Sequence, residues 1–313
     1  MIITVTMNPA IDKTVELDTF VHGGLNRIAS PVTDAGGKGI NVSKTIRAIG
    51  GNTLATGFLG KEGSEKIIDA LQKEQIAHDF VLVDGVTRTN MKIMEKDGTL
   101  TEINEQGMTV SPEKIEELMD KLFTYASEDT LFILAGSIPK GVQTDIYARI
   151  TTKVKEKGAK VFVDADGELF QKSVEAVPSM LKPNHVELAE YFGVNQNADE
   201  AQLVNLGRQL VEKGVETVAI SRGGEGALFV TKDQVIRCGG LDVLVHSTVG
   251  AGDAMVAALA YAKDAGWGWE ESIRLGMAAS AGAVTTVGTK PPARDYIDEL
   301  AKQVELEKVS FFQ

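Results

Sequence analysis

Leu131-Phe132-Ile133-Leu134-Ala135 and Lys160-Val161-Phe162-Val163-Asp164 are two short apolar stretches that enclose a helical pattern at Asp145–Glu156. Each stretch has the length of a buried strand, and its β-branched and aromatic residues favour that structure. Strands that alternate with helices through short connections form parallel sheets covered by helices. This part of the chain therefore predicts an α/β fold with a mostly parallel sheet.

The same alternation extends in both directions along the chain. Further strands are predicted at Ile2–Met7, Leu54–Leu59, Asp79–Val83, Met180–Lys182 and Thr217–Ser221, and further helices at Ile40–Ile49, Ser64–Lys73, Pro112–Tyr125, Glu200–Lys213, Ala254–Ala265 and Glu270–Val287. Several helices end at a glycine that tolerates a left-handed cap, namely Gly50, Gly158, Gly214 and Gly266. Because no long linker or repeat interrupts the pattern, we expect a single domain over residues 1–313 with helices on both faces of its sheet.

Composition excludes several classes of function. The formal net charge of −12 argues against a general nucleic-acid binder, although a cleft with a few cations can still bind small anions. No apolar run approaches the roughly 20 residues of a membrane span, and Met1–Met7 reads as a buried strand without the basic start of a signal peptide. We therefore expect a cytoplasmic protein with neither nucleic-acid nor membrane partners.

Sulfur- and histidine-based chemistry is also disfavoured. Cys238 is the only cysteine, which excludes an intrachain disulfide and a cysteine-built zinc site. The four histidines, His22, His78, His185 and His246, lack the spacing of metal ligands. They are interpreted as ordinary surface or core residues.

One section departs from the strand–helix alternation. Thr87–Glu95 and Thr99–Asn104 flank Asp97-Gly98, which predicts a hairpin. By the period-two rule, Arg88, Asn90 and Lys92 share one face of its first arm, and Thr89, Met91 and Ile93 share the other. With a second strand-like stretch at Thr14–Val21, the hairpin could form a lid inserted at about residues 13–24 and 86–106. A solvated hairpin remains the alternative.

A glycine-rich run, Thr248-Val249-Gly250-Ala251-Gly252-Asp253, leads directly into the apolar helix that starts at Ala254. Glycines at a helix start allow backbone N–H groups to face an anion. A carboxylate beside a bound phosphate suits a base that deprotonates an attacking hydroxyl. The alternative is that Asp253 simply caps its own helix.

A second cluster, Gly36-Gly37-Lys38-Gly39, precedes a helix with Asn41 in its first turn. Its glycines could likewise allow backbone N–H groups at the helix start to face an anion, and Lys38 adds a positive charge. It does not fit the Walker A pattern, and Asn8-Pro9-Ala10 stands where a dinucleotide fingerprint would follow the first strand. An ordinary tight loop remains the alternative.

Two further segments could face a nucleotide. Ser221–Gly226 follows a predicted strand and is dense in glycine, so it could approach a base or a phosphate, or form an ordinary turn. In Lys182-Pro183-Asn184-His185-Val186-Glu187, the spacing of Asn184 and Glu187 is that of a capping box. The same two side chains could instead support Mg²⁺ through water.

The order of these motifs resembles a known family. Asn8-Pro9-Ala10-Ile11-Asp12, Gly36–Asn41 and Thr248–Asp253 are similar to the signatures of the ribokinase-like carbohydrate kinases, and the similarity covers nearly the whole chain. The resemblance implies a Rossmann-like core with a small β-sheet lid, ATP and Mg²⁺ as cofactors, and a sugar as acceptor. A homodimer formed through exposed edges of the lid is a plausible assembly.

The resemblance also implies roles for individual residues. Asp253 matches the catalytic base, and Gly250, Ala251 and Gly252 match the anion hole. Asp12, Gly37, Lys38 and Asn41 match sugar-binding positions; Arg27, Lys38 and Arg88 resemble the cations that hold a sugar phosphate, with Asn90 and Ser137 nearby. Lys182, Asn184, Ser221, Gly223, Gly226 and Thr248 are assigned to the nucleotide, and Glu187 to Mg²⁺ through water. Arg222 departs from the family pattern, and the segment Asp164–Gly167 is assigned no role.

Within this family the motifs are most similar to those of kinases that act on ketohexose phosphates. The implied reaction is ATP-dependent phosphorylation of fructose 1-phosphate at its C6 hydroxyl. Phosphorylation of tagatose 6-phosphate at C1 is the alternative, because a ketohexose furanose is nearly symmetric end to end. A non-catalytic sugar-phosphate-binding regulator is a more remote one, and a nicotinamide dehydrogenase is disfavoured because the first βα turn lacks its fingerprint.

Overall fold

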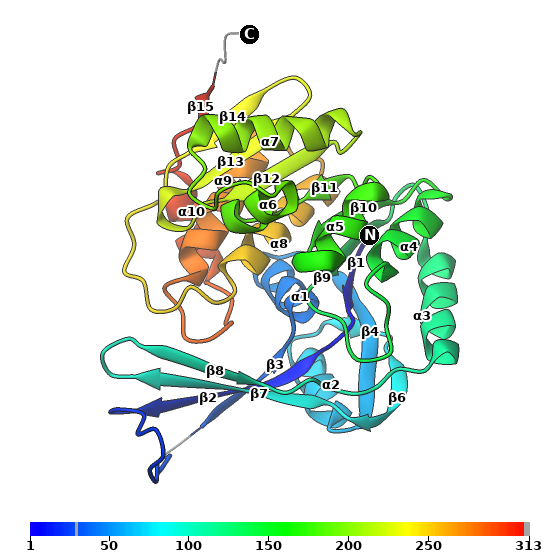
Figure 1. The fold of residues 1–313 in the computed structure, drawn as a ribbon, viewed down its shortest axis with the longest axis vertical. Helices are drawn as coiled ribbons and strands as arrows, with labels where there is room; N and C mark the ends of the chain where they lie inside the picture. Colours follow the sequence, from blue (N-terminus) through cyan, green and yellow to red (C-terminus); the bar gives the residue numbers. More distant parts are fainter. Residues whose placement is uncertain (29–30, 310–313) are drawn as a thin grey trace.

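A large sheet runs through the centre of the molecule (Figure 1). The computed structural model describes residues 1–28 and 31–309, so the predicted domain of residues 1–313 includes a few residues outside the described part. Within the described residues, the order of hydrogen-bonded strands is β15 (Glu307–Lys308), β14 (Val235–Cys238), β13 (Ala227–Thr231), β12 (Thr217–Ser221), β11 (Met180–Leu181), β10 (Lys160–Asp164), β9 (Leu131–Ala135), β1 (Ile2–Thr6), β4 (Thr53–Glu62) and β5 (Ala77–His78), and β6 (Val81–Val86) also pairs with β4.

The predicted parallel sheet is confirmed for the strands from β5 to β12. In the middle of the sheet, Ile133 of β9 lies opposite Thr4 of β1 and Phe162 of β10. The strands β13, β14 and β15 instead extend the sheet in antiparallel fashion. Because parallel strands end at one edge, the segments that follow β1, β9, β10, β11 and β12 all meet on the same side of the molecule.

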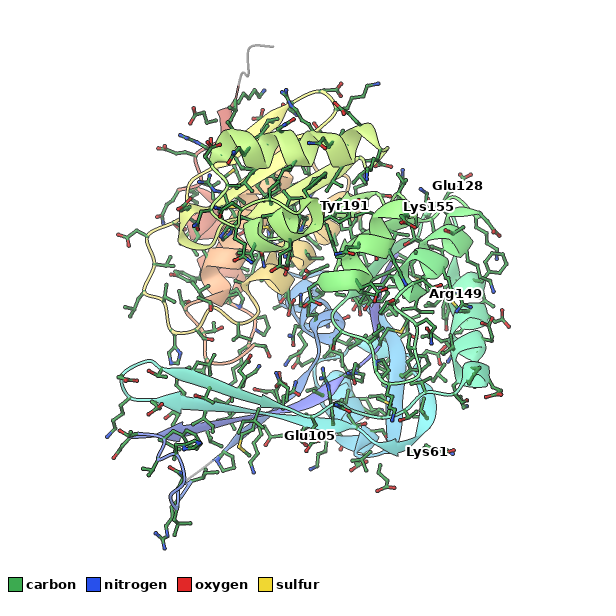
Figure 2. All side chains as sticks on the ribbon, viewed as in Figure 1. Lys61, Glu105, Glu128, Arg149, Lys155 and Tyr191 are labelled. Atoms are coloured by element: carbon green, nitrogen blue, oxygen red, sulfur yellow. The ribbon has the colours of Figure 1, made fainter. Side chains whose placement is uncertain are left out.

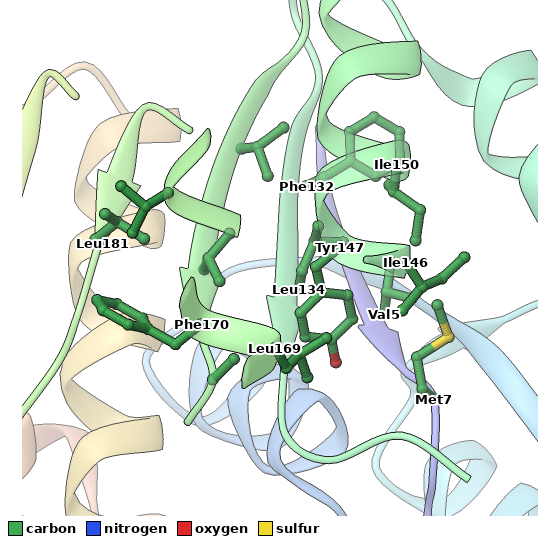
Figure 3. Packing of buried hydrophobic residues seen from close by; sticks show 14 of the residues in the cluster. Val5, Met7, Phe132, Leu134, Ile146, Tyr147, Ile150, Leu169, Phe170 and Leu181 are labelled. Carbon is green, nitrogen blue, oxygen red and sulfur yellow. The ribbon is translucent and has the colours of Figure 1, made fainter. Parts of the chain in front are cut away.

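Helices cover both faces of the large sheet. One face carries α3 (Pro112–Tyr125), α4 (Ile146–Lys155), α5 (Gly167–Glu175), α6 (His185–Phe192) and α7 (Glu200–Glu212), whereas the other carries α1 (Lys38–Ala48), α8 (Ala251–Asp264), α9 (Trp269–Ala283) and α10 (Arg294–Ala301). Figure 3 shows how Phe132 and Leu134 of β9 pack against Tyr147 and Ile150 of α4. Ile133 points to the opposite core, as the period-two rule requires.

A second, smaller sheet projects from the first (Figure 1). Its strand order is β3 (Val32–Gly36), β2 (Ala10–Leu17), β7 (Arg88–Glu95) and β8 (Leu100–Asn104), and α2 (Ser64–Lys73) packs against β3 and β4 at its base. The predicted hairpin is confirmed as β7 and β8. The strand expected at Thr14–Val21 was placed wrongly, because β2 begins at Ala10, where it pairs with Arg88 and Gly36.

Two helices begin earlier than predicted because a glycine caps their amino ends. The helices α1 and α8 begin at Lys38 and Ala251, earlier than the expected Ile40 and Ala254, because Gly37 and Gly250 serve as N-caps with positive φ values of 111° and 85°. The predicted glycine ends of helices are confirmed, since Gly50, Gly158, Gly214 and Gly266 all have positive φ. Among the described residues, no helix is both long and apolar enough to cross a membrane.

Candidate active site

A cleft of about 820 Å³ lies where the carboxyl ends of the central strands, the first turns of α1 and α8, and the small sheet meet. It brings together nearly all of the residues predicted from the sequence. These lining residues are Asp12, Gly37, Lys38, Asn41, Arg88, Asn90, Ser137, Lys182, Asn184, Glu187, Ser221, Gly223, Gly226, Thr248, Gly250, Ala251, Gly252 and Asp253. The arginine predicted at position 27 is absent from this lining. Arg27 lies exposed in the connection between β2 and β3.

Asp253 lies in the first turn of α8 and is buried. Its carboxylate makes no capping hydrogen bond to the described backbone of its own helix, so the capping interpretation was wrong. Instead, Asn41 Nδ2 of α1 donates a hydrogen bond of 2.8 Å to Asp253 Oδ2. Burial raises the pKa of Asp253 to about 6, with Lys38 opposing the rise and Asp164 adding to it. A carboxyl group with this pKa is suited to accept a proton near neutral pH.

The amino end of α8 has the properties of an anion site. The first backbone N–H groups of a helix lack intrahelical acceptors and lie at the positive end of its dipole. Gly250 holds the left-handed conformation that turns the chain into this helix. A side chain at Gly252 would come within 3.1 Å of Lys182 Nζ, so the glycine lets this ammonium lie close to the helix start.

Asp164, to which the sequence assigned no role, is the buried centre of a small ion-pair cluster. It is the last residue of β10, and its Oδ1 lies 3.2 Å from Lys38 Nζ and 3.3 Å from Lys182 Nζ. Burial favours the neutral acid, but the charges of Lys182 and Lys38 outweigh it and lower the pKa of Asp164. The charge of Asp164 in turn raises the pKa of Lys38. A carboxylate at the end of an otherwise apolar strand was the signal that could have identified this residue.

The small sheet supplies the opposite wall of the cleft. Asp12 of β2 is buried, and its Oδ1 accepts a hydrogen bond of 3.2 Å from Asn90 Nδ2 while its Oδ2 lies 3.0 Å from Lys92 Nζ. Arg88, Asn90 and Lys92 all line the cleft. Their predicted common face is therefore confirmed, and the solvated-hairpin interpretation was wrong. Lys92 was missing from the predicted site, although its alternation with Asn90 indicated its direction.

Arg88 anchors the base of the small sheet. Its Nη1 and Nη2 donate hydrogen bonds to the backbone oxygens of Glu105 and Asn8, at 3.1 and 2.9 Å. The Glu105 side chain, at the base of the small sheet in Figure 2, accepts a hydrogen bond from the backbone N–H of Thr89. Burial lowers the pKa of Arg88. The Nε of Arg88 is buried without a hydrogen-bond partner among the described residues.

Glycine-rich segments form the far end of the cleft. Gly226 packs so closely on the backbone that an added Cβ would lie 2.0 Å from the oxygen of Cys238. Arg222 Nη1 donates a hydrogen bond of 2.6 Å to Glu200, and Arg222 also pairs with Glu225. Arg222 is therefore held by acidic side chains of α7 and of its own turn, and it does not line the cleft.

Asn184 and Glu187 form a complete capping box at the start of α6. The capping interpretation is therefore confirmed, and both residues also line the cleft. Burial raises the pKa of Glu187. Within residues 1–28 and 31–309, no group of three or more metal-binding side chains is assembled.

Comparisons with known proteins agree with this geometry. The family model described as pfkB family carbohydrate kinase matches residues 5–295. The chain is 36% identical to a 1-phosphofructokinase of Bacillus subtilis, over 99% of this chain and all of the relative, and 30% identical to a D-tagatose-1-phosphate kinase of Bacillus licheniformis, over 98% and 99% of the two chains. The crystal structure of Escherichia coli phosphofructokinase-2 in complex with substrates and products superposes with a TM-score of 0.92 at 25% identity, over 96% of this chain and 98% of that one. The chain belongs to the pfkB family of carbohydrate kinases.

Proposed function

We propose that this protein transfers the γ-phosphoryl group of ATP to the C6 hydroxyl of fructose 1-phosphate, giving fructose 1,6-bisphosphate and ADP. The observation that carries the proposal is the buried Asp253 carboxylate at the amino end of α8, which shares a cleft with Asp12 and Asn90 of the small sheet. Similarity to 1-phosphofructokinases over nearly the full length supports the choice of acceptor.

Asp253 accepts the proton of the C6 hydroxyl as the bond from that oxygen to the γ-phosphorus forms. The bond between the γ-phosphorus and the β,γ-bridging oxygen breaks, and ADP carries away the electron pair. The backbone N–H groups of Gly250, Ala251 and Gly252 stabilise the charge on the transferring group. Most of the acceleration should come from such positioning and electrostatics, and the base should contribute on the order of 10²–10⁴.

Mg²⁺ accompanies ATP in this proposal, with Glu187 and Asn184 supporting its hydration shell from the start of α6. When bound, the cation neutralises charge on the nucleotide phosphates. Lys182, Ser221, Gly223, Gly226 and Thr248 are proposed to contact the nucleotide, because they line the half of the cleft that the glycine-rich segments form.

The acceptor occupies the half of the cleft beside the small sheet. Asp12 and Asn41 bind ring hydroxyls, and Arg88 with Asn90 and Ser137 holds the existing phosphate. The sequence also assigns Lys38 and Arg27 to that phosphate; Lys38 lines the cleft, whereas Arg27 does not. Tagatose 1-phosphate is a second candidate acceptor because it is the C4 epimer of fructose 1-phosphate and a relative is a D-tagatose-1-phosphate kinase.

We further propose that two copies of the chain associate through the small sheet, in the cytoplasm. The sheet and its β2–β3 connection expose several large apolar side chains, namely Val21, Leu25, Ile28, Val32 and Ile103. Leu25 is 72% exposed. Exposed apolar groups beside unpaired strand edges favour self-association.

An ADP-release assay with a panel of acceptors tests the proposed reaction. Fructose 1-phosphate should give the highest kcat/KM, above tagatose 1-phosphate, tagatose 6-phosphate, fructose 6-phosphate and ribose. Highest activity with another sugar would overturn the acceptor. Absence of ADP release with every sugar would favour a non-catalytic regulator.

The variant Asp253→Asn tests the base. It should lower kcat by about 10²–10⁴ and leave ATP affinity little changed, because the amide keeps the shape but cannot accept the proton. Asp120→Asn serves as the control, since this carboxylate pairs with Lys153 on the surface. Near-normal turnover of Asp253→Asn would contradict the assignment.

A further inference from the structure

Asp164 lies at the carboxyl end of β10, a central strand of the large sheet, and forms ion pairs with two lysines that come from different elements. Lys38 begins α1, and Lys182 follows β11, the strand next to β10. Both ammonium groups approach the same oxygen, Oδ1, at 3.2 and 3.3 Å. The second oxygen, Oδ2, is buried and has no hydrogen-bond partner among the described residues.

This cluster carries an excess positive charge. Among the described residues, Asp164 is the one carboxylate that forms an ion pair with either lysine, so these three side chains carry a net charge of +1, which Asp253 and Glu187 offset only through longer-range electrostatic interactions. Burying charges is unfavourable unless they are paired, and an excess charge needs a further counter-ion. An anion bound in the cleft would therefore give the second ammonium group a direct partner.

The direction of the lysines indicates where that anion lies. The Nζ of Lys182 lies against Gly252, at the start of α8. Lys38 is partly exposed to the cleft and interacts electrostatically with Asp253 and Glu187 as well as with Asp164. Both amines therefore border the region that contains the proposed base and the free N–H groups of α8.

We propose that Asp164 is a positioning residue that holds the amines of Lys38 and Lys182 at the transferring phosphoryl group. The inference rests on the proposed phosphoryl transfer and assigns Lys38 to the transferring group instead of the existing sugar phosphate. The Asp164 carboxylate acts through the two lysines, and its fixed charge prevents them from pairing with the base Asp253. Such preorganisation places positive charge where negative charge moves during the reaction.

The test is Asp164→Asn, assayed with the acceptor on which the wild-type enzyme is most active. We expect kcat to fall about 100-fold while the KM for the sugar phosphate stays within about threefold, because the lysines are no longer aimed at the reacting group. The acid limb of the pH profile of kcat/KM should also move to lower pH. Asp253 is faced by Lys38 and Asn41 of α1, by Asp164 and by Lys182, so loss of the Asp164 charge leaves its cationic neighbours unopposed.

Two further variants separate positioning from a structural role. Asp164→Glu keeps the charge and should retain the wild-type acid limb, with a kcat at least tenfold above that of Asp164→Asn. Glu168→Gln makes the same kind of change outside the cleft, where Glu168 pairs with Lys172, and should alter neither quantity. If Asp164→Asn does not fold, the double variant Asp164→Asn/Lys182→Met restores the charge balance and should fold with the same low kcat.

The inference is overturned if Asp164→Asn keeps kcat within about threefold of the wild type, or if kcat falls equally at every pH with no shift of the acid limb. A uniform fall would indicate a structural role for Asp164. Either result is distinct from failure of the proposed function, which would appear as absence of ADP release by the wild-type enzyme.

Discussion

Asp253 and Asp164 are both buried carboxylates, yet their pKa values shift in opposite directions. Asp164 contacts two ammonium groups, whose charges outweigh the effect of burial and lower its pKa. Burial raises the pKa of Asp253 to about 6. The hydrogen bond from the neutral amide of Asn41 stabilises the charged form of Asp253, but less than burial destabilises it. Two neighbouring acids whose pKa values are driven apart commonly have different roles in catalysis. This contrast supports the proposals that Asp253 accepts the proton and that Asp164 acts through its negative charge.

This difference predicts the pH dependence of the reaction. An acid whose pKa is raised becomes protonated at a higher pH, so the base form of Asp253 is lost as the pH falls through about 6. At saturating ATP, kcat/KM for the sugar phosphate should be level above this pH and fall about tenfold per unit below it. Steady-state rates between pH 5 and 8 test this expectation.

The phosphate of the acceptor also ionises near pH 6, so the limb needs an independent assignment. The hydrogen bond from Asn41 favours the charged form of Asp253. Asn41→Ala should therefore move the acid limb to higher pH, whatever its effect on the height of the profile. A limb that stays in place in this variant would belong to the substrate and not to Asp253.

At the scale of single elements, the end of α2 has a local conflict between sequence and geometry. The backbone N–H of Ile76 bonds to the oxygen of Leu71, and that of Gln75 bonds to the oxygen of Gln72, which is the Schellman pattern. Gln75 occupies the left-handed position with a φ of 56°. Glycine is the usual residue there, as at Gly50 after α1 and Gly266 after α8.

Gln75→Gly should therefore raise the free energy of unfolding by about 0.5–1 kcal/mol, because glycine adopts the left-handed region without a Cβ penalty. The hydrogen bond from Arg47 to the exposed Gln75 side chain is lost, which offsets little. Gln72→Gly is the matched control, since the same substitution within the helix should lower stability by a similar amount. Thermal unfolding of both variants tests whether Gln75→Gly raises the free energy of unfolding while Gln72→Gly lowers it. Destabilisation by Gln75→Gly would contradict the argument.

The local sequence pattern alone predicted the strands that are buried on both faces and the helices that bury one continuous apolar face. The bounds of β9, β10 and β12 and of α2 and α3 agree with the predicted ones. The local pattern did not predict strands whose formation or register depends on pairing with a segment that is distant in the sequence. The strand β3 was not predicted, because Val32–Gly36 is polar and glycine-terminated and becomes a strand only by pairing with β2. The register of β2 likewise depends on β7, about 80 residues away in sequence.

The candidate site shows the same division. The glycine motifs and the face of Arg88 and Asn90 were visible in the sequence because spacing alone defines them. Asp164 was missed because its meaning depends on Lys38 and Lys182, which only the folded sheet brings to one oxygen. The alternative interpretation of Asp253 as a helix cap was wrong for a related reason. Its partner Asn41 lies 212 positions away in the chain.

At the scale of the whole molecule, the cleft exists because the chain forms two sheets. The carboxyl end of β11 provides Lys182, the first residue of α1 is Lys38, and the small sheet provides Asp12, Arg88 and Asn90. A protein with a formal net charge of −12 can still place individual cations, here Lys38, Arg88, Lys92 and Lys182, along a cleft for an anionic substrate. Placing the two halves of the site on separate sheets also allows the small sheet to act as a lid that excludes water.

The small sheet has a second consequence, because its apolar side chains have no cover within the described part of one chain. If two copies bury them together, the protein should sediment at twice the chain mass of 33.5 kDa at micromolar concentration. Leu25→Asp and Ile103→Asp place charges on the exposed apolar groups and should shift the equilibrium to the single chain, since a buried unpaired charge is unfavourable. Val194→Asp, at an exposed apolar residue after α6, is the control that should leave the mass unchanged. Sedimentation of the unmodified protein as a single chain at these concentrations would overturn the proposed dimer, whereas dissociation caused equally by Val194→Asp would move the interface away from the small sheet.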